Sequence, residues 1–225
     1  MFDGRWFDIN DTNRSVTLPN VKEMGMGRSM KTEADGSPAP RARDKISSVA
    51  ADLFYREGIR AVGVETIVKQ AGVTKISLYR SFPSKDDLVV AYLEERSRTF
   101  LDNWDEMFDR HRDDPRAQLR AIMTYLAERT TTEGYRGCPF INFCAEFPDP
   151  EHPGRKVARD TKAALRERFL TIAMALDVPR PQKLADGLLL LIEGAYAISQ
   201  TFGGGKDGPG HALVSAAEAM VGGWS

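Results

Sequence analysis

Two cysteines are too few to give a chain of 225 residues a disulfide framework. Long apolar runs are also missing: the most apolar stretch, residues 187–198, is interrupted by Glu193 and is too short to span a bilayer. The N-terminus lacks the basic start and apolar segment of a signal peptide. These absences predict a cytoplasmic protein with reduced thiols and no membrane segment.

Patterns for catalysis and metal binding are absent as well. His111, His152 and His211 lie far apart in the sequence, and none has metal-type spacing with a cysteine, so we interpret them as surface residues. There is no G-x-S-x-G motif, no P-loop and no G-x-G-x-x-G after a strand, and the glycines at 203–205 suit a loop between helices. The sequence predicts no enzyme, no metal and no cofactor.

The composition suits a globular protein of one or two domains, with 42% hydrophobic and 28% charged residues. A net charge of −1 gives no indication of nucleic-acid binding, but the charge is unevenly distributed. Residues 41–87 hold nine Lys or Arg and six Asp or Glu, a net +3, which leaves −4 for the remainder. Positive charge is therefore concentrated where phosphate contact would need it.

Two short helices joined by a tight turn form the strongest local pattern. Apolar residues at i, i+3, i+4 and i+7 from Val64 predict a helix that ends at Ala71, before Gly72. Thr74 is placed to cap a second helix over residues 75–82. Such a pair is a helix-turn-helix, which can lie in a DNA major groove, or else an ordinary helical hairpin with a solvated face.

The second of these helices has a polar outer face. Leu78 and Phe82, four residues apart, are expected to face inward, while the other side chains offer cations, hydroxyls, a phenol and one aliphatic group. We predict base-edge contacts from Lys75, Ile76, Ser77 and Arg80, and phosphate contacts from Thr74, Tyr79 and Lys85. For Lys85 the alternative is a solvated lysine.

The order AGV, three residues, SLY, two residues, F, one residue and SK resembles the DNA-binding signature of the TetR family of bacterial repressors. The resemblance extends backwards through a first helix over 44–57 and its stop at Gly58, and so covers about residues 44–90. Two positions depart from it. Gly63 stands where the family usually has a Ser or Thr cap, and Val68 where Ala is usual, and glycine is a weaker but tolerated cap.

Residues 1–40 show neither helical nor strand periodicity, so we expect a flexible N-terminal extension there. The resemblance implies an all-α fold with a three-helix helix-turn-helix DNA-binding domain (41–87) and a helical ligand-binding and dimerisation domain (88–225). TetR-like regulators bind a palindromic operator as homodimers, and a small-molecule effector releases them. The same partners are implied here: double-stranded DNA, an unknown effector and a second copy. The alternative is an α-helical small-molecule-binding protein or enzyme whose helix-turn-helix resemblance is accidental. Arg41 and Arg43 could also lie on an arm that reaches DNA.

Periodicity predicts further helices over about 85–112, 115–132, 153–176, 182–202 and 212–221, and a short helix within 135–150. This last segment is rich in aromatic residues and bounded by Gly and Pro. We expect an effector pocket lined by some of Trp104, Phe108, Met123, Phe140, Phe143 and Cys144, although aromatic stripes at helical spacing are usually core. The basic row Arg155, Arg159, Lys162 and Arg166 is interpreted as a solvated face.

Two further expectations concern the thiol and the dimer. Cys138 could sense electrophiles or oxidants, but a buried structural thiol is favoured because Arg136 is the only basic residue near it in the sequence. The last two helices are expected to pack against a second copy as a four-helix bundle. The dimer contacts would come from Leu188, Leu191, Ala195, Ala212, Ala216 and Ala219.

Overall fold

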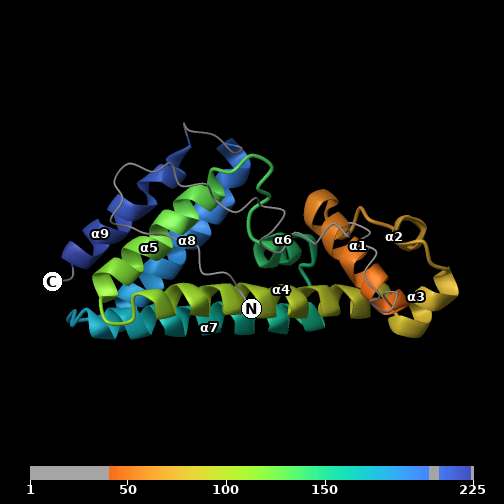
Figure 1. Ribbon diagram of the computed structural model, residues 1–225, viewed down its shortest axis with the longest axis horizontal. Helices are drawn as coiled ribbons and strands as arrows, with labels where there is room; N and C mark the ends of the chain where they lie inside the picture. The colour runs from red at the N-terminus through yellow and green to blue at the C-terminus, as the bar shows by residue number, and fades with distance from the viewer. Residues whose placement is uncertain (1–40, 203–207, 224–225) are drawn as a thin grey trace, which may run out of the picture. The chain divides into compact units, whose positions relative to one another are not determined.

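The computed structural model describes residues 41–202 and 208–223, and this part of the chain is helical without strands, which confirms the predicted all-α fold class (Figure 1). The expectations for residues 1–40, and for the glycines at 203–205, lie outside the described residues. The elements are α1 (Ala42–Glu57), α2 (Val64–Ala71), α3 (Lys75–Ser81), α4 (Lys85–Arg110), α5 (Pro115–Thr130), α6 (Pro139–Glu146), α7 (Pro153–Ala175), α8 (Pro181–Phe202), η1 (Pro209–Ala212) and α9 (Leu213–Gly222).

Helices α1 to α3 form one small core with the start of α4. Helix α2 ends at Gly72, whose φ of 63° is left-handed, and the Thr74 hydroxyl caps α3 by accepting from the Ser77 amide at 3.1 Å. Leu78 and Phe82 point inward and are almost fully buried, as predicted. The local signals of the helix-turn-helix therefore form the structure that the sequence pattern indicates.

Helix α4 continues from the helix-turn-helix into the C-terminal helices. The Ser84 hydroxyl caps its first turn by accepting from the Asp87 amide at 3.0 Å. Along its length α4 runs beside α7 (Figure 1), and two polar links join them. Ser97 and Thr161 share a hydrogen bond of 2.7 Å, and Nε and Nη2 of Arg168 each donate to an oxygen of the Asp105 carboxylate at 2.6 Å.

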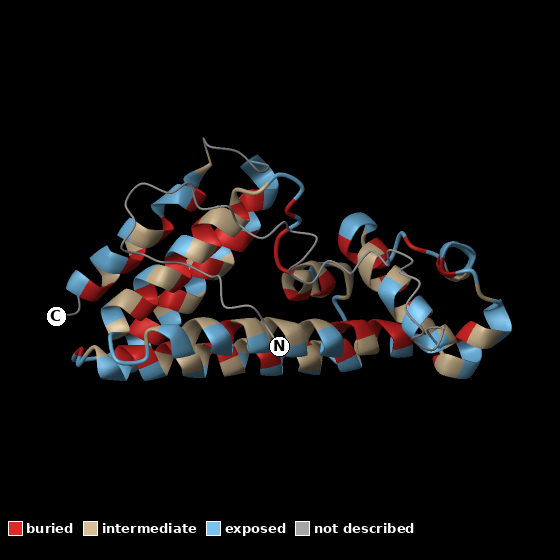
Figure 2. Ribbon diagram, viewed as in Figure 1, coloured by how far each residue is buried: buried red, intermediate tan, exposed pale blue. Residues whose placement is uncertain are grey.

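The C-terminal core lies where α5, α7, α8 and α9 turn their apolar faces toward one another, as the red faces in Figure 2 show. Each fully buried Leu, Ile or Phe stabilises the fold by about 1.5–3 kcal/mol. The largest contributors include Ile122, Leu165, Phe169, Leu188 and Ile192, all without measurable exposure. Leu188 and Ala195 are thus buried within their own chain, so the prediction that they supply dimer contacts is wrong.

A different stripe of α8 is exposed. Leu190 is 73% exposed, and Gly194 and Ala197 follow it on the same face at helical spacing. The predicted contact residues Ala212, at the end of η1, and Ala219 of α9 are exposed. The exposed apolar surface of α8 is therefore centred on Leu190, next to the predicted Leu191, which is half-buried.

The loop before α6 packs tightly against α1 and α8. The Tyr55 hydroxyl of α1 donates to the Gly137 carbonyl at 3.2 Å and accepts from the Arg136 amide at 3.1 Å. Gly137 has a φ of 72°, and a Cβ there would lie 3.0 Å from the Tyr196 carbonyl oxygen and 2.6 Å from Gln200 Nε2. Only glycine fits this approach without displacing backbone.

Replacing Gly137 by alanine should therefore lower the free energy of unfolding more than the same change at Gly134. Gly134 has a φ of 76° but open space around it, so alanine there costs only the conformational term, about 1–2 kcal/mol. At Gly137 the overpacking adds at least about 1 kcal/mol. Urea unfolding followed by circular dichroism at equal protein concentrations measures both. Equal destabilisation by the two substitutions would contradict the packing described for this loop.

Candidate nucleic-acid interface and ligand cavity

Helix α3 presents a polar surface to solvent. Thr74, Lys75 and Arg80 are exposed, and Ile76 and Tyr79 are 73% and 43% exposed despite their apolar character. Ser77 is half-buried. The structure thus brings six of the seven predicted DNA-contact residues together on one short helix and its cap, and their roles toward DNA stay predictions.

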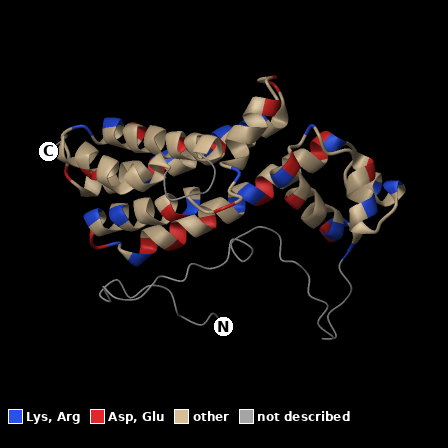
Figure 3. Cartoon of the chain, turned by 90° about the horizontal axis from the view of Figure 1, so that it is seen from above, with Lys and Arg blue, Asp and Glu red and all other residues tan. Residues whose placement is uncertain are grey.

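The charged residues of this surface differ in their present partners. The Lys75 ammonium lies 2.6 Å from the Glu65 carboxylate of α2, and this hydrogen bond raises the pKa of Lys75 and lowers the pKa of Glu65. Such a pair in open solvent is weak and can exchange for a phosphate. Among the described residues, no acceptor binds the Arg80 guanidinium, so Arg80 is available to a ligand. Figure 3 shows that basic and acidic residues are otherwise interspersed over the helices.

Two basic residues near α3 already have structural partners. The Lys85 ammonium donates to the Ile59 carbonyl at 2.7 Å, and partial burial lowers its pKa. A phosphate contact by Lys85 would have to share or replace that bond. Arg43 lies in the first turn of α1, donates to the Ser81 carbonyl at 2.6 Å and stacks over the Phe82 ring. Arg43 therefore belongs to α1 rather than to a separate arm.

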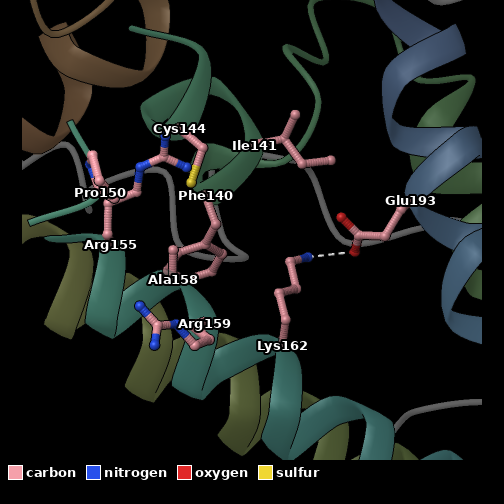
Figure 4. Close-up of a pocket in the computed structure, with 9 residues that line it drawn as sticks. All are labelled: Phe140, Ile141, Cys144, Pro150, Arg155, Ala158, Arg159, Lys162 and Glu193. Carbon is pink, nitrogen blue, oxygen red and sulfur yellow. Dashed lines mark hydrogen bonds and ion pairs between the residues drawn. The ribbon is translucent and has the colours of Figure 1, made fainter. Parts of the chain in front are cut away.

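A cavity of about 400 Å³ opens between α6, α7 and α8 (Figure 4). Its lining consists of Phe140, Ile141, Cys144, Pro150, Arg155, Ala158, Arg159, Lys162 and Glu193. Phe140 and Cys144 are the two predicted pocket residues that line it. A cavity of this size, with one apolar wall and charged groups on the others, can hold a small molecule.

The other four predicted pocket residues are core side chains. Met123 is fully buried, and Trp104 packs edge-on against Phe169 and beside Phe108 with ring centroids 5.5 and 5.8 Å apart. Phe143 stacks on the Phe147 ring at 5.0 Å. Trp104, Phe108, Met123 and Phe143 do not line the cavity, and they illustrate the general rule that aromatic stripes at helical spacing form core.

The basic row of α7 was predicted to be solvated, and for Lys162 this is wrong. Its ammonium lies 2.5 Å from the Glu193 carboxylate and 5.3–5.7 Å from the ring centroids of Phe100, Phe140 and Tyr196. Burial disfavours its charged form, but Cys138 and Glu193 raise the pKa of Lys162 above the usual value. The signal in the sequence was Glu193, a lone acid within the most apolar stretch, which needs a partner when buried.

Cys138 is buried beside this pair. Its sulfur lies 3.3 Å from the Lys162 ammonium, a basic neighbour that lies 24 positions away and that the sequence did not indicate. Burial raises the pKa of the Cys138 thiol, while Lys162 acts in the opposite direction. Burial therefore works against the thiolate form that a reactive cysteine needs. Its role as a sensor stays a prediction.

His152 is not the surface residue that its isolation suggested. Its side chain is 10% exposed and stands edge-on to the Phe143 and Phe147 rings, with centroids 5.2 and 5.0 Å away. Its Nδ1 accepts from the Gly154 amide at 3.0 Å and so caps α7. His152 therefore stabilises the junction of α6 and α7. Among the described residues, no cluster of His, Cys, Asp or Glu is suited to hold a metal ion.

Helix α6 connects the cavity to the helix-turn-helix. Its last residue, Glu146, accepts from the amides of Ile59 and Arg60 at 3.1 and 2.7 Å, in the turn that leads from α1 to α2. Its first turn is held by Tyr55 of α1 through the loop described above. One face of α6 thus lines the cavity, while its last residue and the loop before it are hydrogen-bonded to α1 or to the turn between α1 and α2.

Known proteins are similar to this chain in sequence and in fold. The family described as "Bacterial regulatory proteins, tetR family" matches residues 46–92. The HTH-type transcriptional regulator YjdC of Escherichia coli is 26% identical over 159 residues, which cover 69% of this chain and 81% of YjdC. The HTH-type transcriptional repressor KstR2 of Rhodococcus jostii is 35% identical over 96 residues, 40% of this chain and 44% of KstR2.

A solved structure agrees over most of the chain. SCO4454, a TetR-family transcriptional regulator from Streptomyces coelicolor, superposes with a TM-score of 0.75 and 28% identity, covering 82% of this chain and 96% of that protein. The fold and site define a helix-turn-helix transcriptional regulator with a helical C-terminal domain. Residues 46–92 match the TetR family's DNA-binding domain, and the fold of the described chain is that of TetR-family regulators. No helix in the described ranges combines the length and apolarity needed to cross a membrane.

Removing the Glu146 carboxylate should loosen the turn between α1 and α2. In Glu146→Ala, the Ile59 and Arg60 amides lose a charged acceptor worth about 1.5 kcal/mol or more, so their hydrogen exchange should accelerate roughly tenfold. Exchange in the middle of α4 should not change. Glu151→Ala, which removes an exposed carboxylate just after α6, is the matched control. Unchanged exchange over residues 58–63 in Glu146→Ala would contradict this link.

Proposed function

We propose that this protein is a cytoplasmic repressor that binds a palindromic operator as a homodimer and is released by a small-molecule effector. The exposed polar face of α3 carries the proposal, and similarity to the TetR family supports it. KstR2 is itself named a repressor. The regulators that this chain resembles are not enzymes, and we assign it a regulatory and not a catalytic role.

Direct reading of DNA would use the middle of α3. Arg80 and Lys75 can donate to guanine, Ser77 can donate or accept, and Ile76 can contact a thymine methyl group. Thr74 and Tyr79, at the edges of the same surface, can donate to phosphates and fix the helix in the groove. The buried Leu78 and Phe82 hold α3 against α1, so the reading side chains project from a fixed support.

Replacing Arg80 by alanine should relax base preference at one position of each half-site. A bidentate contact with guanine is worth about 1–3 kcal/mol, so affinity for the best operator should fall roughly 5- to 150-fold while non-specific binding changes little. The operator is first selected from random DNA with the unaltered protein, and affinities are then measured for single-base variants at fixed salt.

The matched control is Arg110→Ala, which removes an exposed arginine at the far end of α4. This variant should keep both affinity and selectivity. If the double variant Lys75→Ala, Arg80→Ala also kept both, the assignment of α3 as the reading helix would be wrong.

A dimer is needed because one short helix reads too few base pairs for selectivity, and two copies on a palindrome double the reading. The exposed stripe of α8 with Leu190, Gly194 and Ala197 supports an interface there. The small residues allow a partner helix to approach closely, and Leu190 would be buried on contact. Ala212 of η1 and Ala219 of α9 extend the same kind of surface.

Leu190→Glu should therefore convert the dimer into a monomer at micromolar concentration. A charge placed in an apolar contact must be desolvated, which costs several kcal/mol unless the contact opens. Met174→Glu is the matched control, because Met174 is also exposed, at 64%, but lies on α7. Light scattering gives the mass of each variant. A Leu190→Glu protein that remained dimeric would place the interface elsewhere.

Effector release would act through α6. A ligand in the cavity would contact Phe140 and Ile141 on this helix. The loop before α6 is hydrogen-bonded to α1, and the last residue of α6 is hydrogen-bonded to the turn between α1 and α2. A small displacement of α6 would therefore change how the helix-turn-helix is held. In a dimer, such a change alters the separation of the two reading helices, which must match the spacing of the half-sites.

A further inference from the structure

The cavity between α6, α7 and α8 carries an excess of positive charge. Its lining contains three cations, Arg155, Arg159 and Lys162, and one carboxylate, Glu193. All three cations lie on α7, at spacings of four and three residues, so they share the face that borders the cavity (Figure 4). A site with this lining attracts anions more strongly than neutral or cationic molecules.

The positive charge available to a ligand belongs to the two arginines. Lys162 and Glu193 neutralise each other at 2.5 Å and form the inner wall of the cavity. No residue in the described part of the chain accepts a hydrogen bond from Arg159. Arg155 donates one bond, to the Pro148 carbonyl at 3.0 Å, and its buried Nε has no partner there. A buried donor without an acceptor is costly, and an incoming anion would satisfy it.

The opposite wall of the cavity is apolar. Phe140, Ile141 and Cys144 of α6 face Ala158 of α7 across it. Aromatic and aliphatic surfaces next to a pair of guanidinium groups match a molecule with an apolar body and a single acidic group. The cavity volume of about 400 Å³ is large enough for such a molecule and small compared with a peptide or nucleic-acid site.

We propose that the effector is an amphipathic organic acid, bound as its anion. Its acidic group is held by Arg155 and Arg159, and its apolar body lies against Phe140 and Ile141. Binding of the anion depends only on the cavity, whereas its effect on DNA rests on the function proposed above. The two can therefore be tested separately.

Binding is tested with a pair of fluorescent probes that differ in charge. 8-Anilinonaphthalene-1-sulfonate is an aromatic anion, and N-phenyl-1-naphthylamine has the same rings without the sulfonate. The anion should bind the full-length protein at least about tenfold more tightly at low salt, because hydrogen bonds to charged groups are worth about 1.5–3 kcal/mol. Decanoate should displace it and 1-decanol should not. Equal affinity for the two probes, or equal displacement, would overturn the proposal.

Variants locate the anion. Arg155→Gln, Arg159→Gln should weaken binding of the sulfonate about tenfold or more without changing binding of the neutral probe. Arg116→Gln, at an exposed arginine on α5 that does not line the cavity, should bind both probes normally. If the double variant bound the sulfonate as tightly as the unaltered protein, the anion would not sit at these arginines.

A third variant tests electrostatics independently of the arginines. Glu193→Gln removes the single acid of the lining and frees Lys162, so it should tighten binding of the sulfonate several-fold. Weaker or unchanged sulfonate binding in a folded Glu193→Gln protein would contradict the charge argument. Circular dichroism establishes that each variant is folded before binding is measured.

Operator affinity measured with and without decanoate separates this inference from the proposed function. Release of DNA together with displacement of the sulfonate would support both. Displacement with no loss of operator binding would support the anion site and contradict effector release. An intact operator complex in a protein that binds neither anion would overturn the anion site and leave DNA binding standing.

Discussion

The Glu146 carboxylate makes hydrogen bonds on which the placement of the DNA-binding helices depends. It accepts from two consecutive amides, those of Ile59 and Arg60, which lie more than 80 positions earlier in the chain. Hydrogen bonds to an ionised acceptor are about twice as strong as neutral ones. They also fix the direction of the turn from α1 to α2, and α3 packs on both helices. The orientation of the exposed face of α3 is thereby tied to α6.

Helix α6 is short, with eight residues, and contributes few buried side chains of its own beyond Phe140 and Phe143. Its position also depends on the loop before it, which Tyr55 of α1 holds, and on Glu146 at its C-terminal end. The remaining side of α6 borders the cavity. An element held in this way can shift without exposing a large apolar surface. Under the proposed function, this is the property that lets a small ligand act on a distant DNA contact, through a contiguous chain of physical contacts.

The ion pair of Lys162 and Glu193 is a second constraint with a functional meaning. Placing two charges in an apolar interior is often no better for stability than well-packed hydrophobic residues. Here the pair lies between α7 and α8, next to the Cys138 thiol and three aromatic rings, and forms one wall of the cavity. It supplies a polar surface that the apolar bundle would otherwise lack at this point. The adjacent arginines then give the cavity its positive charge.

Local signals in the sequence determined the helices and their ends. Thr74, Ser84 and Asp114 cap the helices that follow them, and Gly72 ends α2, because these effects involve only residues within one turn. The period of apolar residues likewise placed α4 and α7 to within a few residues. The outward face of α3 followed from the same periodicity. The family was indicated by the order of residues from AGV to SK, which resembles the TetR signature.

Contacts between distant helices were decided only by the tertiary structure. The pairing of Lys162 with Glu193, the burial of His152, the cap from Glu146 and the exposure of Leu190 all depend on how two helices rotate and cross. Periodicity tells which face of a helix is apolar, but not which face of another helix it meets. The exposed face of α3 could therefore be predicted, since it lies on one short helix. Most of the cavity lining, which comes from three helices, could not.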